Sequence, residues 1–474
     1  MGLGVSWTHD LVVIGAGSAG LTAAGGCARL GLRVALVERG RMGGECLNTG
    51  CVPSKALLAA AQRAHGMRGD RLGIAGSGPM VDFAAVRAHV QAAIAAIAPH
   101  DSAGRFEAWG VEVIHGDASF AGRNSIRVGA RRLAAPRIVL ATGSDPAVPD
   151  LPGLRDVPFL TNETLFDLDT LPRHLLVLGG GSIGLEMGQA FRRLGSDVTI
   201  VDRGAILPRS DPEAAAILVA GLRAEGITLH EHCAVSAVSG QPGCVRLDRD
   251  GQAPVEGSHL LVATGRRARL DGLDLETAGV TWTEDGITVD ARRRTANKAV
   301  YAIGDCRAGP RFTHAAGYEG RLVVAALGFG LPSPARFDAL PAVTYTDPEL
   351  AQLGLTEAEA RARHRHVAVT IEPWSENDRA VAEGDTLGFI KLVRAGRRLV
   401  GVTILGAGAG DLLLPWSMVM RGKASRWSLG GAVVPYPTRS ELSQAAAFRA
   451  YEARLFGAAA RRWARTLAWT RRFR

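Results

Sequence analysis

A pattern of strand, glycine-rich turn, helix and second strand constrains the fold more than any other feature of the chain. Its first copy runs from DLVVIGAGSAG at 10–20 to RVALVERG at 33–40. The turn glycines and the closing acid are Gly15, Gly17, Gly20 and Glu38. Such glycines let a pyrophosphate approach the helix N-terminus, and the acid binds ribose hydroxyls. We therefore predict a dinucleotide-binding α/β domain at the start of the chain.

The same pattern occurs again, from LLVLGGGSIG at 175–184 to DVTIVDRG at 197–204. Its glycines and acid are Gly179, Gly181, Gly184 and Asp202. In both copies the acid follows the first glycine by 23 positions. Two such domains predict two bound dinucleotides, one a flavin and one a nicotinamide. The alternative is a duplicated fold in which one site no longer binds.

Residues 43–55, GGECLNTGCVPSK, contain the closest pair of cysteines among the six in the chain. On a regular helix the Cα atoms of Cys46 and Cys51 would lie roughly 8–9 Å apart, whereas a disulfide needs about 4.4–6.8 Å. We therefore expect Asn48-Thr49-Gly50 to bend the chain, and Pro53 to begin a helix whose N-terminus favours a thiolate at Cys51. This pattern predicts a reducible, catalytic disulfide. The alternatives are a structural bridge, which would constrain only a short loop, and two unrelated thiols.

Composition and charge limit the class of protein. The 474 residues are 47% hydrophobic, which is typical of a globular chain. No stretch of 18 uninterrupted apolar residues is present, and we expect a cytoplasmic protein. The net charge of +9 is concentrated at the end, because residues 454–474 contain seven arginines and no acid. The remaining chain is nearly neutral, which argues against nucleic-acid binding.

The motifs predict five segments. These are a first dinucleotide domain with the redox helix (1–149), a second dinucleotide domain (150–268), a central segment returning to the first domain (269–337), an α+β dimerisation domain (338–456) and a basic tail (457–474). In the dimerisation domain we expect strands near 342–346, 366–372, 387–394 and 398–404, with helices at 409–422 and 439–456. A further helix is expected over the alanine-rich stretch 82–98.

Together these motifs resemble those of the class I pyridine nucleotide-disulfide oxidoreductases, which include dihydrolipoamide dehydrogenase, glutathione reductase and mercuric reductase. The resemblance extends from Asp10 to about Phe456 and rests on the cysteine motif, both glycine patterns, AIGD and PYPTRSE. It implies a homodimer with two Rossmann-like α/β domains, FAD in the first and a nicotinamide in the second. We expect NAD(H) to be preferred over NADP(H), because Asp202 repels a 2′-phosphate. Hydride would pass from NAD(P)H through the flavin to the Cys46–Cys51 disulfide, and from the dithiol to a disulfide or soft-metal acceptor.

The resemblance also implies roles for individual positions. Cys51 would be the sulfur beside the flavin, Cys46 the sulfur that exchanges with substrate, and Lys55 would pair with Glu186 near flavin and nicotinamide. The positions that match FAD binding are Gly15, Gly17, Gly20, Glu38, Lys55, Ala118, Thr142, Gly143, Asp305, Arg311 and His314. Those that match nicotinamide binding are Gly179, Gly181, Gly184, Glu186, Asp202, Val235 and Gly265. We predict no resident metal site.

Departures from the family pattern bear on the electron acceptor. Disulfide reductases of the family carry a histidine five residues before the position of Glu441, and this pair acts from the partner subunit as acid and base. Here Tyr436 replaces the histidine, and a tyrosine pKa near 10, against about 6.5 for histidine, makes a poor proton shuttle at neutral pH. We therefore expect slow turnover of lipoamide and glutathione disulfide. The alternative is that His314 takes over the acid–base role of the missing histidine.

Mercuric reductases also have tyrosine at this position, which favours metal reduction, but they carry a C-terminal cysteine pair that RRWARTLAWTRRFR lacks. Ser182 stands where many members have a tyrosine that covers the flavin. The named alternatives are therefore a mercuric reductase-like enzyme, a dihydrolipoamide dehydrogenase and a membrane-peripheral NADH:quinone reductase. The cysteine motif argues against a quinone acceptor.

The basic tail predicts a helix on which Trp463 and Leu467 lie four residues apart, with arginines over much of the remaining surface. We expect a solvated terminal helix. The alternative is weak contact with an anionic membrane surface, which this composition also fits.

Overall fold

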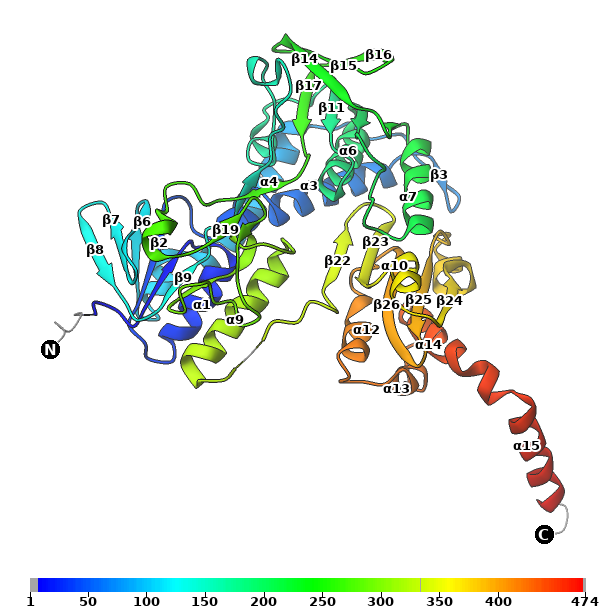
Figure 1. The fold of residues 1–474 in the computed structure, drawn as a ribbon. Coiled ribbons are helices and arrows are strands. Elements are labelled where there is room, and N and C mark those ends of the chain that lie inside the picture. The colour runs from blue at the N-terminus through cyan, green and yellow to red at the C-terminus, as the bar shows by residue number, and fades with distance from the viewer. Residues whose placement is uncertain (1–6, 333, 472–474) are drawn as a thin grey trace. The chain divides into compact units, whose positions relative to one another are not determined.

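The computed structural model describes residues 7–332 and 334–471, and the chain divides into two compact units. Unit 1 contains the residues up to 69, then 76–205 and 226–336. Unit 2 contains 70–75, 206–225 and the chain from 337 onward. Figure 1 shows the order of the elements along the chain. In the described residues, no helix is long and apolar enough to cross a membrane.

The first sheet of unit 1 has five parallel strands in the order β21-β9-β1-β2-β5. They are β1 (Leu11–Ile14), β2 (Val34–Glu38), β5 (Val111–His115), β9 (Ile138–Leu140) and β21 (Val300–Ala302). β1 and β9 are buried along their whole length, as expected of parallel strands covered on both faces. Because β21 pairs in parallel with β9, the turn after β21 lies at the same sheet edge as the glycine turn after β1.

Two helices pack together beside this sheet, α1 (Ser18–Ala28) and α9 (Thr313–Phe329). Small residues allow the close contact, since a Cβ at Gly320 would lie 2.7 Å from the Cβ of Thr22. The packing fixes both helix N-termini in one unit, and each of them follows a strand of the same sheet.

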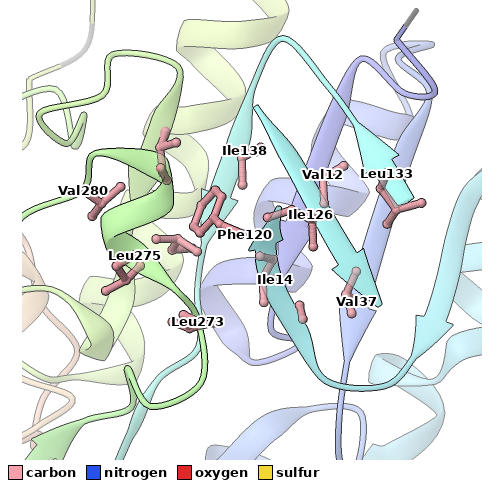
Figure 2. Packing of buried hydrophobic residues seen from close by; sticks show 14 of the residues in the cluster. Val12, Ile14, Val37, Phe120, Ile126, Leu133, Ile138, Leu273, Leu275 and Val280 are labelled. Atoms are coloured by element: carbon pink, nitrogen blue, oxygen red, sulfur yellow. The ribbon is translucent and has the colours of Figure 1, made fainter. Parts of the chain in front are cut away.

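A hydrophobic core joins the sheet to two smaller elements of unit 1 (Figure 2). One is the antiparallel sheet β6 (Ala118–Gly122), β7 (Ser125–Val128) and β8 (Arg131–Ala134), and the other contains α8 (Leu275–Ala278). The fully or nearly buried side chains include Val12, Val37, Phe120, Ile126, Leu133, Ile138 and Leu275. This packing anchors the loops that leave the carboxyl edge of the main sheet.

The second sheet of unit 1 repeats the design with four parallel strands in the order β13-β12-β11-β17. They are β11 (His174–Leu178), β12 (Asp197–Val201), β13 (Thr228–His230) and β17 (His259–Val262), with α6 (Ser182–Leu194) following β11. An antiparallel sheet of β14 (Val235–Gln241), β15 (Cys244–Arg249) and β16 (Gln252–Gly257) is attached. Short strands β10 (Ser144–Pro146) and β18 (Arg266–Ala268) pair where the chain passes between the two halves.

Between β2 and β5 the chain forms three helices, α2 (Gly44–Asn48), α3 (Cys51–Gly66) and α4 (Phe83–Ile97), followed by the short α5 (Ala103–Glu107). The predicted helix over 82–98 is therefore present as α4, with Asp82 as its N-cap accepting a hydrogen bond from Ala85 N. α3 packs against α6 of the second half. This contact brings the cysteine motif to the second dinucleotide fold.

Unit 2 is built on an antiparallel sheet in the order β22-β23-β26-β25-β24. The strands are β22 (Pro341–Thr344), β23 (Glu349–Gly354), β24 (Val367–Pro373), β25 (Phe389–Ala395) and β26 (Arg398–Gly406). Four of the five match predicted strands, whereas β23 was not predicted. Its sequence, ELAQLG, has no β-branched residue, and pairing with β22 and β26 overrides its weak strand propensity.

The helices of unit 2 include α7 (Pro212–Ala224), α10 (Glu357–Arg363), α11 (Asp378–Ala382), α12 (Leu413–Met420), α13 (Arg426–Gly430), α14 (Ser440–Leu455) and α15 (Ala458–Thr470). α12 and α14 correspond to the predicted helices at 409–422 and 439–456. Trp374 and Trp416 are fully buried in the core of this unit. The indole N–H of Trp416 donates to the Ser443 hydroxyl at 3.1 Å, which ties α12 to α14.

Candidate active site

The cysteine motif folds into two short helical segments with a break between them. α2 ends at Asn48, whose amide donates to the Gly44 carbonyl at 2.7 Å, and α3 begins at Cys51. Gly50 has a φ of −129°, outside the left-handed region, but a Cβ there would lie 3.0 Å from the Glu45 carbonyl oxygen. Close approach to Glu45, rather than a positive φ, therefore favours glycine. The helix begins two residues before the predicted Pro53, which places the Cys51 thiol in its first turn.

Cys51 has a strongly acidic thiol. The Cys46 thiol donates a hydrogen bond to its sulfur, and this lowers the pKa of Cys51 to about 6 even though burial acts in the opposite direction. The Thr313 hydroxyl, 3.3 Å away, and the charge of Lys55 lower the pKa further, while the charge of Glu186 raises it. A thiolate at neutral pH is the nucleophilic form of a cysteine.

Cys46 has the opposite character. The hydrogen bond to Cys51 holds its proton and, with burial, raises the pKa of Cys46 well above the ordinary value. In the protein chain alone Cys51 is exposed and Cys46 partly buried. One cysteine thus ionises easily while the other retains its proton.

Lys55 and Glu186 form an ion pair beside the cysteines. Lys55 stands on α3, four residues after Cys51, and Glu186 stands on α6. Lys55 Nζ lies 2.7 Å from Glu186 Oε2, and the Glu186 side chain is only 7% exposed. The pair that the resemblance implied is therefore brought together by the packing of α3 on α6.

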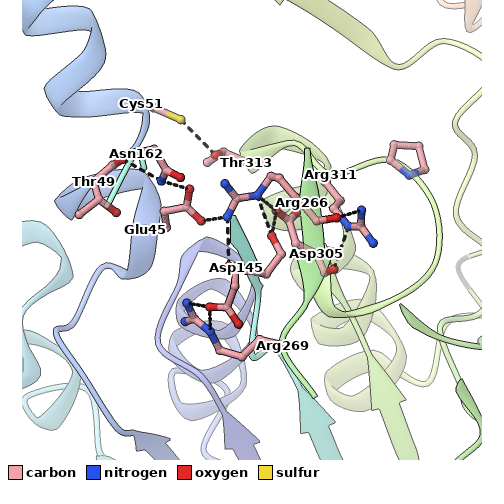
Figure 3. A network of polar contacts seen from close by, with 12 residues as sticks. Glu45, Thr49, Cys51, Asp145, Asn162, Arg266, Arg269, Asp305, Arg311 and Thr313 are labelled. Carbon is pink, nitrogen blue, oxygen red and sulfur yellow. Dashed lines mark hydrogen bonds and ion pairs between the residues drawn. The ribbon is translucent and has the colours of Figure 1, made fainter. Parts of the chain in front are cut away.

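A second polar network surrounds Glu45, the residue before Cys46 (Figure 3). Arg266 donates to its carboxylate from β18, and the Asn162 amide donates at 2.8 Å. The same Asn162 amide also donates to the Thr49 carbonyl at 3.2 Å. Burial raises the pKa of Glu45 to about 7, against the lowering effect of Arg266. The network ties α2 and the Thr49–Gly50 break to β18, the short strand that pairs with β10.

The same Arg266 side chain reaches the turn after β21. Arg266 Nε donates to the Ser144 hydroxyl at 2.8 Å, and that hydroxyl donates to Asp305 Oδ2 at 3.0 Å. Sequence reasoning assigned no role to Glu45, Asn162, Ser144, Arg266 or Thr313, although Glu45 lies within the cysteine motif. These residues come from five separate segments, so only the folded chain brings them together.

The first glycine turn has the geometry of a dinucleotide site. Gly15 has φ +103°, and a Cβ there would lie 2.3 Å from the Ala141 carbonyl oxygen, so only glycine fits. Gly17 caps α1 without a side-chain hydrogen bond, and the first turn carries no acid. The backbone N–H groups of this helix end therefore suit a pyrophosphate. Gly20 lies in the first turn of α1.

Glu38 completes the turn. Its two carboxylate oxygens accept hydrogen bonds from Ala16 N at 2.6 Å and Gly40 N at 2.7 Å. Each oxygen keeps a further lone pair, so ribose hydroxyls are suitable additional donors. The chemistry of this set of residues fits the ADP half of FAD.

The other positions matched to FAD lie around the same sheet edge. Ala118 is buried at the start of β6, and the Thr142 hydroxyl donates to the Arg269 carbonyl at 2.7 Å. Gly143 has φ +76° and Asp305 lies in the turn after β21. The Arg311 guanidinium donates to the carbonyls of Arg266 and Asp285, each at 2.8 Å, so in this chain it braces the turn. The His314 ring stacks on Phe312 at 5.2 Å.

The second glycine turn reproduces the first. Gly179 has φ +116°, and a Cβ there would lie 2.4 Å from the Ala263 carbonyl oxygen. Asp202 accepts from Gly180 N and Gly204 N, both at 2.7 Å, which matches the bonding of Glu38. Gly181 caps α6, again without a side-chain cap or a first-turn acid, and Gly184 lies in its first turn.

The two remaining positions matched to nicotinamide binding flank this fold. Val235 begins β14 and is partly buried. Gly265 has φ +140° and accepts a hydrogen bond from Ala147 N at 2.9 Å. Both copies of the sequence pattern therefore form the same turn, and the second has the geometry that suits a nicotinamide dinucleotide.

The C-terminal motif lies in unit 2. The Tyr436 hydroxyl donates to Asp378 Oδ2 at 2.9 Å, and this bond raises the pKa of Tyr436 above its usual value. Glu441 accepts from Thr438 N at 2.9 Å. Both Asp378 and Glu441 line a pocket of about 430 Å³ that also includes Phe448. Among the residues described, no cluster of His, Cys, Asp and Glu has the arrangement of a metal site.

Comparison with known proteins finds matches to a single protein family over most of the chain. Residues 9–320 match the family model described as pyridine nucleotide-disulphide oxidoreductase. Residues 340–447 match the dimerisation domain of that family. The two matched segments cover both dinucleotide folds and the sheet of unit 2.

Similar proteins include a mercuric reductase of Streptomyces lividans, 37% identical over 93% of this chain and 95% of that protein. A dihydrolipoyl dehydrogenase of Thermus scotoductus is 38% identical over 92% of this chain and 95% of its own length. The solved structure of the HOCl-induced flavoprotein disulfide reductase RclA from Escherichia coli has 28% identity and a TM-score of 0.83, over 93% of this chain and 99% of RclA. A Cu(II) complex of RclA also has a TM-score of 0.83.

The repeated dinucleotide folds, the paired thiols and these matches lead to one assignment. The chain belongs to the pyridine nucleotide-disulphide oxidoreductase family and is an FAD-dependent NAD(P)H oxidoreductase.

Proposed function

We propose that this oxidoreductase uses the Cys46–Cys51 pair to reduce a soft metal ion, such as Hg(II) or Cu(II), with NADH as electron donor. The observation that carries the proposal is the contrast between two groups. Cys51 has a pKa of about 6, whereas the phenol of Tyr436 is bound to Asp378 and has a raised pKa. The site thus provides a thiolate without an efficient proton shuttle.

The residues around the first glycine turn would hold FAD, through the N-terminus of α1, Glu38 and the turn at Asp305. A flavin bound there supplies two-electron transfer between a nicotinamide and a disulfide. Lys55 places a positive charge beside Cys51 and is held by Glu186. Its charge stabilises the Cys51 thiolate when the disulfide is reduced.

The electron balance is simple. Reduction breaks the Cys46–Cys51 bond, and two electrons and one proton give the Cys51 thiolate and the Cys46 thiol. Reoxidation re-forms the bond as two electrons pass to one Hg(II) ion or to two Cu(II) ions, and Cys46 releases its proton. Soft metal ions bind thiolates directly. A disulfide acceptor instead releases thiols that need protons, and general acid catalysis speeds that step.

The relatives support a metal acceptor. Several are mercuric reductases, and RclA forms a Cu(II) complex. A disulfide acceptor is the second candidate, because Glu441 is retained and RclA is a flavoprotein disulfide reductase.

The oligomer and nicotinamide belong to the same proposal. The dimerisation-domain match supports a homodimer in which Tyr436 of one subunit serves the cysteine pair of the other. The charge of Asp202 at the end of β12 favours NADH, because it repels the 2′-phosphate of NADPH. A cytoplasmic location would keep the unused cysteines reduced.

The test is anaerobic NADH oxidation by the FAD-loaded enzyme with Hg(II), Cu(II), glutathione disulfide, lipoamide and a quinone as separate acceptors. We expect metal-dependent oxidation that is lost in Cys46→Ser and Cys51→Ser. Cys244→Ser is the matched control, because Cys244 is exposed on β15, outside the site, and should keep the wild-type rate. A faster rate with either disulfide than with both metals would contradict the metal proposal. A Cys51→Ser variant with full metal turnover would contradict the cysteine mechanism as well.

A further inference from the structure

The last helix of the chain, α15 (Ala458–Thr470), has an unusual surface. None of its residues is buried, and Trp463 and Trp469 are 64% and 61% exposed. It follows α14 in unit 2 (Figure 1) and lies beyond residue 447, where the match to the dimerisation domain ends. The helix is therefore an addition to the matched fold, with its arginines and Trp463 exposed.

The side chains of α15 divide into two faces. At 100° per residue, Trp463, Leu467, Ala460 and Ala464 lie within one arc of about 100°. Arg461, Arg465 and Arg462 lie on the opposite side, together with Trp469. The helix therefore has a narrow apolar stripe with a basic face behind it, and Arg471 caps its C-terminal end.

We infer that α15 lies on an anionic lipid surface, with Trp463 and Leu467 inserted at the headgroup boundary and the arginines against the phosphates. Charge complementarity supports this partner. Seven of the net nine positive charges of the chain come from residues 454–474, which contain no acid. Such a helix attaches parallel to the membrane without crossing it, and tryptophan favours the interface between headgroups and acyl chains.

A second copy of the chain is a weaker partner for this face. A stable protein interface buries about 800 Å² on each side and has a well-packed apolar centre. The stripe of α15 offers only two large apolar side chains, Trp463 and Leu467, among alanines. A helix at a membrane interface needs less buried apolar area, since shallow insertion and attraction of the arginines to anionic headgroups act together.

The test uses the FAD-loaded, full-length protein in vesicle co-sedimentation at low salt. Vesicles contain phosphatidylcholine alone or phosphatidylcholine with phosphatidylglycerol. We expect the protein to pellet with the anionic vesicles, and not with the neutral ones. Binding should disappear in about 1 M salt, where the screening length falls to about 3 Å. A chain that ends at Phe456 should not pellet, and equal pelleting of both chains would overturn the inference.

Point variants separate the two parts of the contact. Replacing Arg461, Arg462 and Arg465 by glutamine should lower the partition coefficient about 100-fold, at about fivefold per arginine. The matched control replaces Arg361, Arg363 and Arg365, which are exposed in unit 2 and make at most i,i+4 surface pairs. It removes the same charge from elsewhere and should bind as the wild type does. An equal loss of vesicle binding in both variants would point to a non-specific charge effect and would contradict α15 as the binding site.

The apolar stripe is tested by Trp463→Ala with Leu467→Ala. We expect this variant to lose most of its pelleting even at low salt, and wild-type pelleting would contradict insertion. Sedimentation velocity without lipid tests the alternative partner, which is a second copy of the chain. If the chain ending at Phe456 loses its dimer, α15 packs on a second copy, and the lipid inference is wrong. NADH oxidation with a soluble acceptor should be the same in all these variants, so this test is independent of the proposed reaction.

Discussion

The hydroxyl of Thr313 lies 3.3 Å from the sulfur of Cys51, although 262 positions separate the two residues in the chain. Thr313 is the first residue of α9 and Cys51 is the first residue of α3. The Cys51 sulfur thus lies at the positive end of one helix and receives a hydrogen bond from the start of another. The Cys46 hydrogen bond lowers the pKa of Cys51 most, and the Thr313 hydroxyl lowers it further, so the thiol ionises at a pH below neutrality.

The first prediction concerns the pH dependence of Cys51. In the reduced enzyme its thiolate forms as the pH rises through about 6, so alkylation by iodoacetamide should reach half its maximal rate near that pH. Thr313→Val should move this midpoint up by about one to two pH units, since a hydrogen bond to a charged group is worth about 1.5–3 kcal/mol. Thr313→Ser keeps the hydroxyl and should keep the midpoint. Peptide mass spectrometry identifies the labelled cysteine, and an unchanged midpoint in the valine variant would contradict the assignment.

The second prediction uses the opposite effects of Lys55 and Glu186 on the same thiol. The charge of Lys55 lowers the pKa of Cys51 and the charge of Glu186 raises it. Lys55→Met should therefore shift the alkylation midpoint to higher pH, and Glu186→Gln should shift it to lower pH, each by about one unit. The double variant should lie between the two. Shifts of the same sign would show that the ion pair acts on the cysteine only through the fold.

The third prediction concerns Tyr436. Wild-type enzyme should reduce lipoamide and glutathione disulfide slowly, because the phenol is bound to Asp378 and has a raised pKa. Tyr436→His should increase these rates by up to about 100-fold, the lower range for a positioned acid–base group. Tyr436→Phe removes the hydroxyl without adding a base and should stay slow. Steady-state rates decide the question, and a wild-type rate with lipoamide that equals its metal-dependent rate would contradict it.

The fourth prediction is a preference for NADH. Asp202 is held by two backbone N–H groups at the end of β12, so its charge is fixed where a 2′-phosphate would lie. Asp202→Ser should change the ratio of kcat/KM values for NADH and NADPH at least about tenfold in favour of NADPH. Arg203→Gln removes the neighbouring positive charge and should shift the ratio toward NADH. A wild-type preference for NADPH would refute the assignment.

The fifth prediction concerns the stability of unit 2. Lys391 is 1% exposed, and its ammonium lies 2.9 Å from Asp211 and 2.5 Å from Glu213. Lys391→Met should reduce the free energy of unfolding by about 3–5 kcal/mol, because it leaves a buried carboxylate without its partner. Asp211→Asn in the same chain keeps the N-cap of α7 and removes the charge, so the double variant should recover much of the loss. Urea denaturation measures both, and no recovery in the double variant would contradict the ion-pair explanation.

Sequence patterns predicted those parts of the fold that depend on residues close together in the chain. The strand, glycine and acid order gave both dinucleotide folds, because only glycine fits at Gly15 and Gly179. The cysteine spacing predicted the break between α2 and α3, although the helix begins at Cys51 and not at Pro53. β23 was missed, because its residues favour no strand and its pairing is decided by β22 and β26.

The environment of the thiols was less accessible to sequence reasoning. The Lys55–Glu186 contact followed from the resemblance to known enzymes, and not from spacing. Thr313, Arg266 and Asn162 reach the cysteine segment from distant strands and loops, so no periodicity marks them. One signal was present, because Thr313 directly follows the Arg311–Phe312 turn and begins the helix after AIGD. The pKa of Cys51 depends on this tertiary arrangement.

The most direct test of the account is a count of thiols in the denatured enzyme before and after reduction by NADH. The chain has six cysteines, of which Cys27, Cys233, Cys244 and Cys306 lie outside the pair. The FAD-loaded enzyme, purified in air and denatured anaerobically, should show four thiols per subunit, and six after prior treatment with NADH. Cys244→Ser should show three and five. Six thiols before reduction, or four after it in an enzyme that oxidises NADH, would contradict a redox disulfide between Cys46 and Cys51.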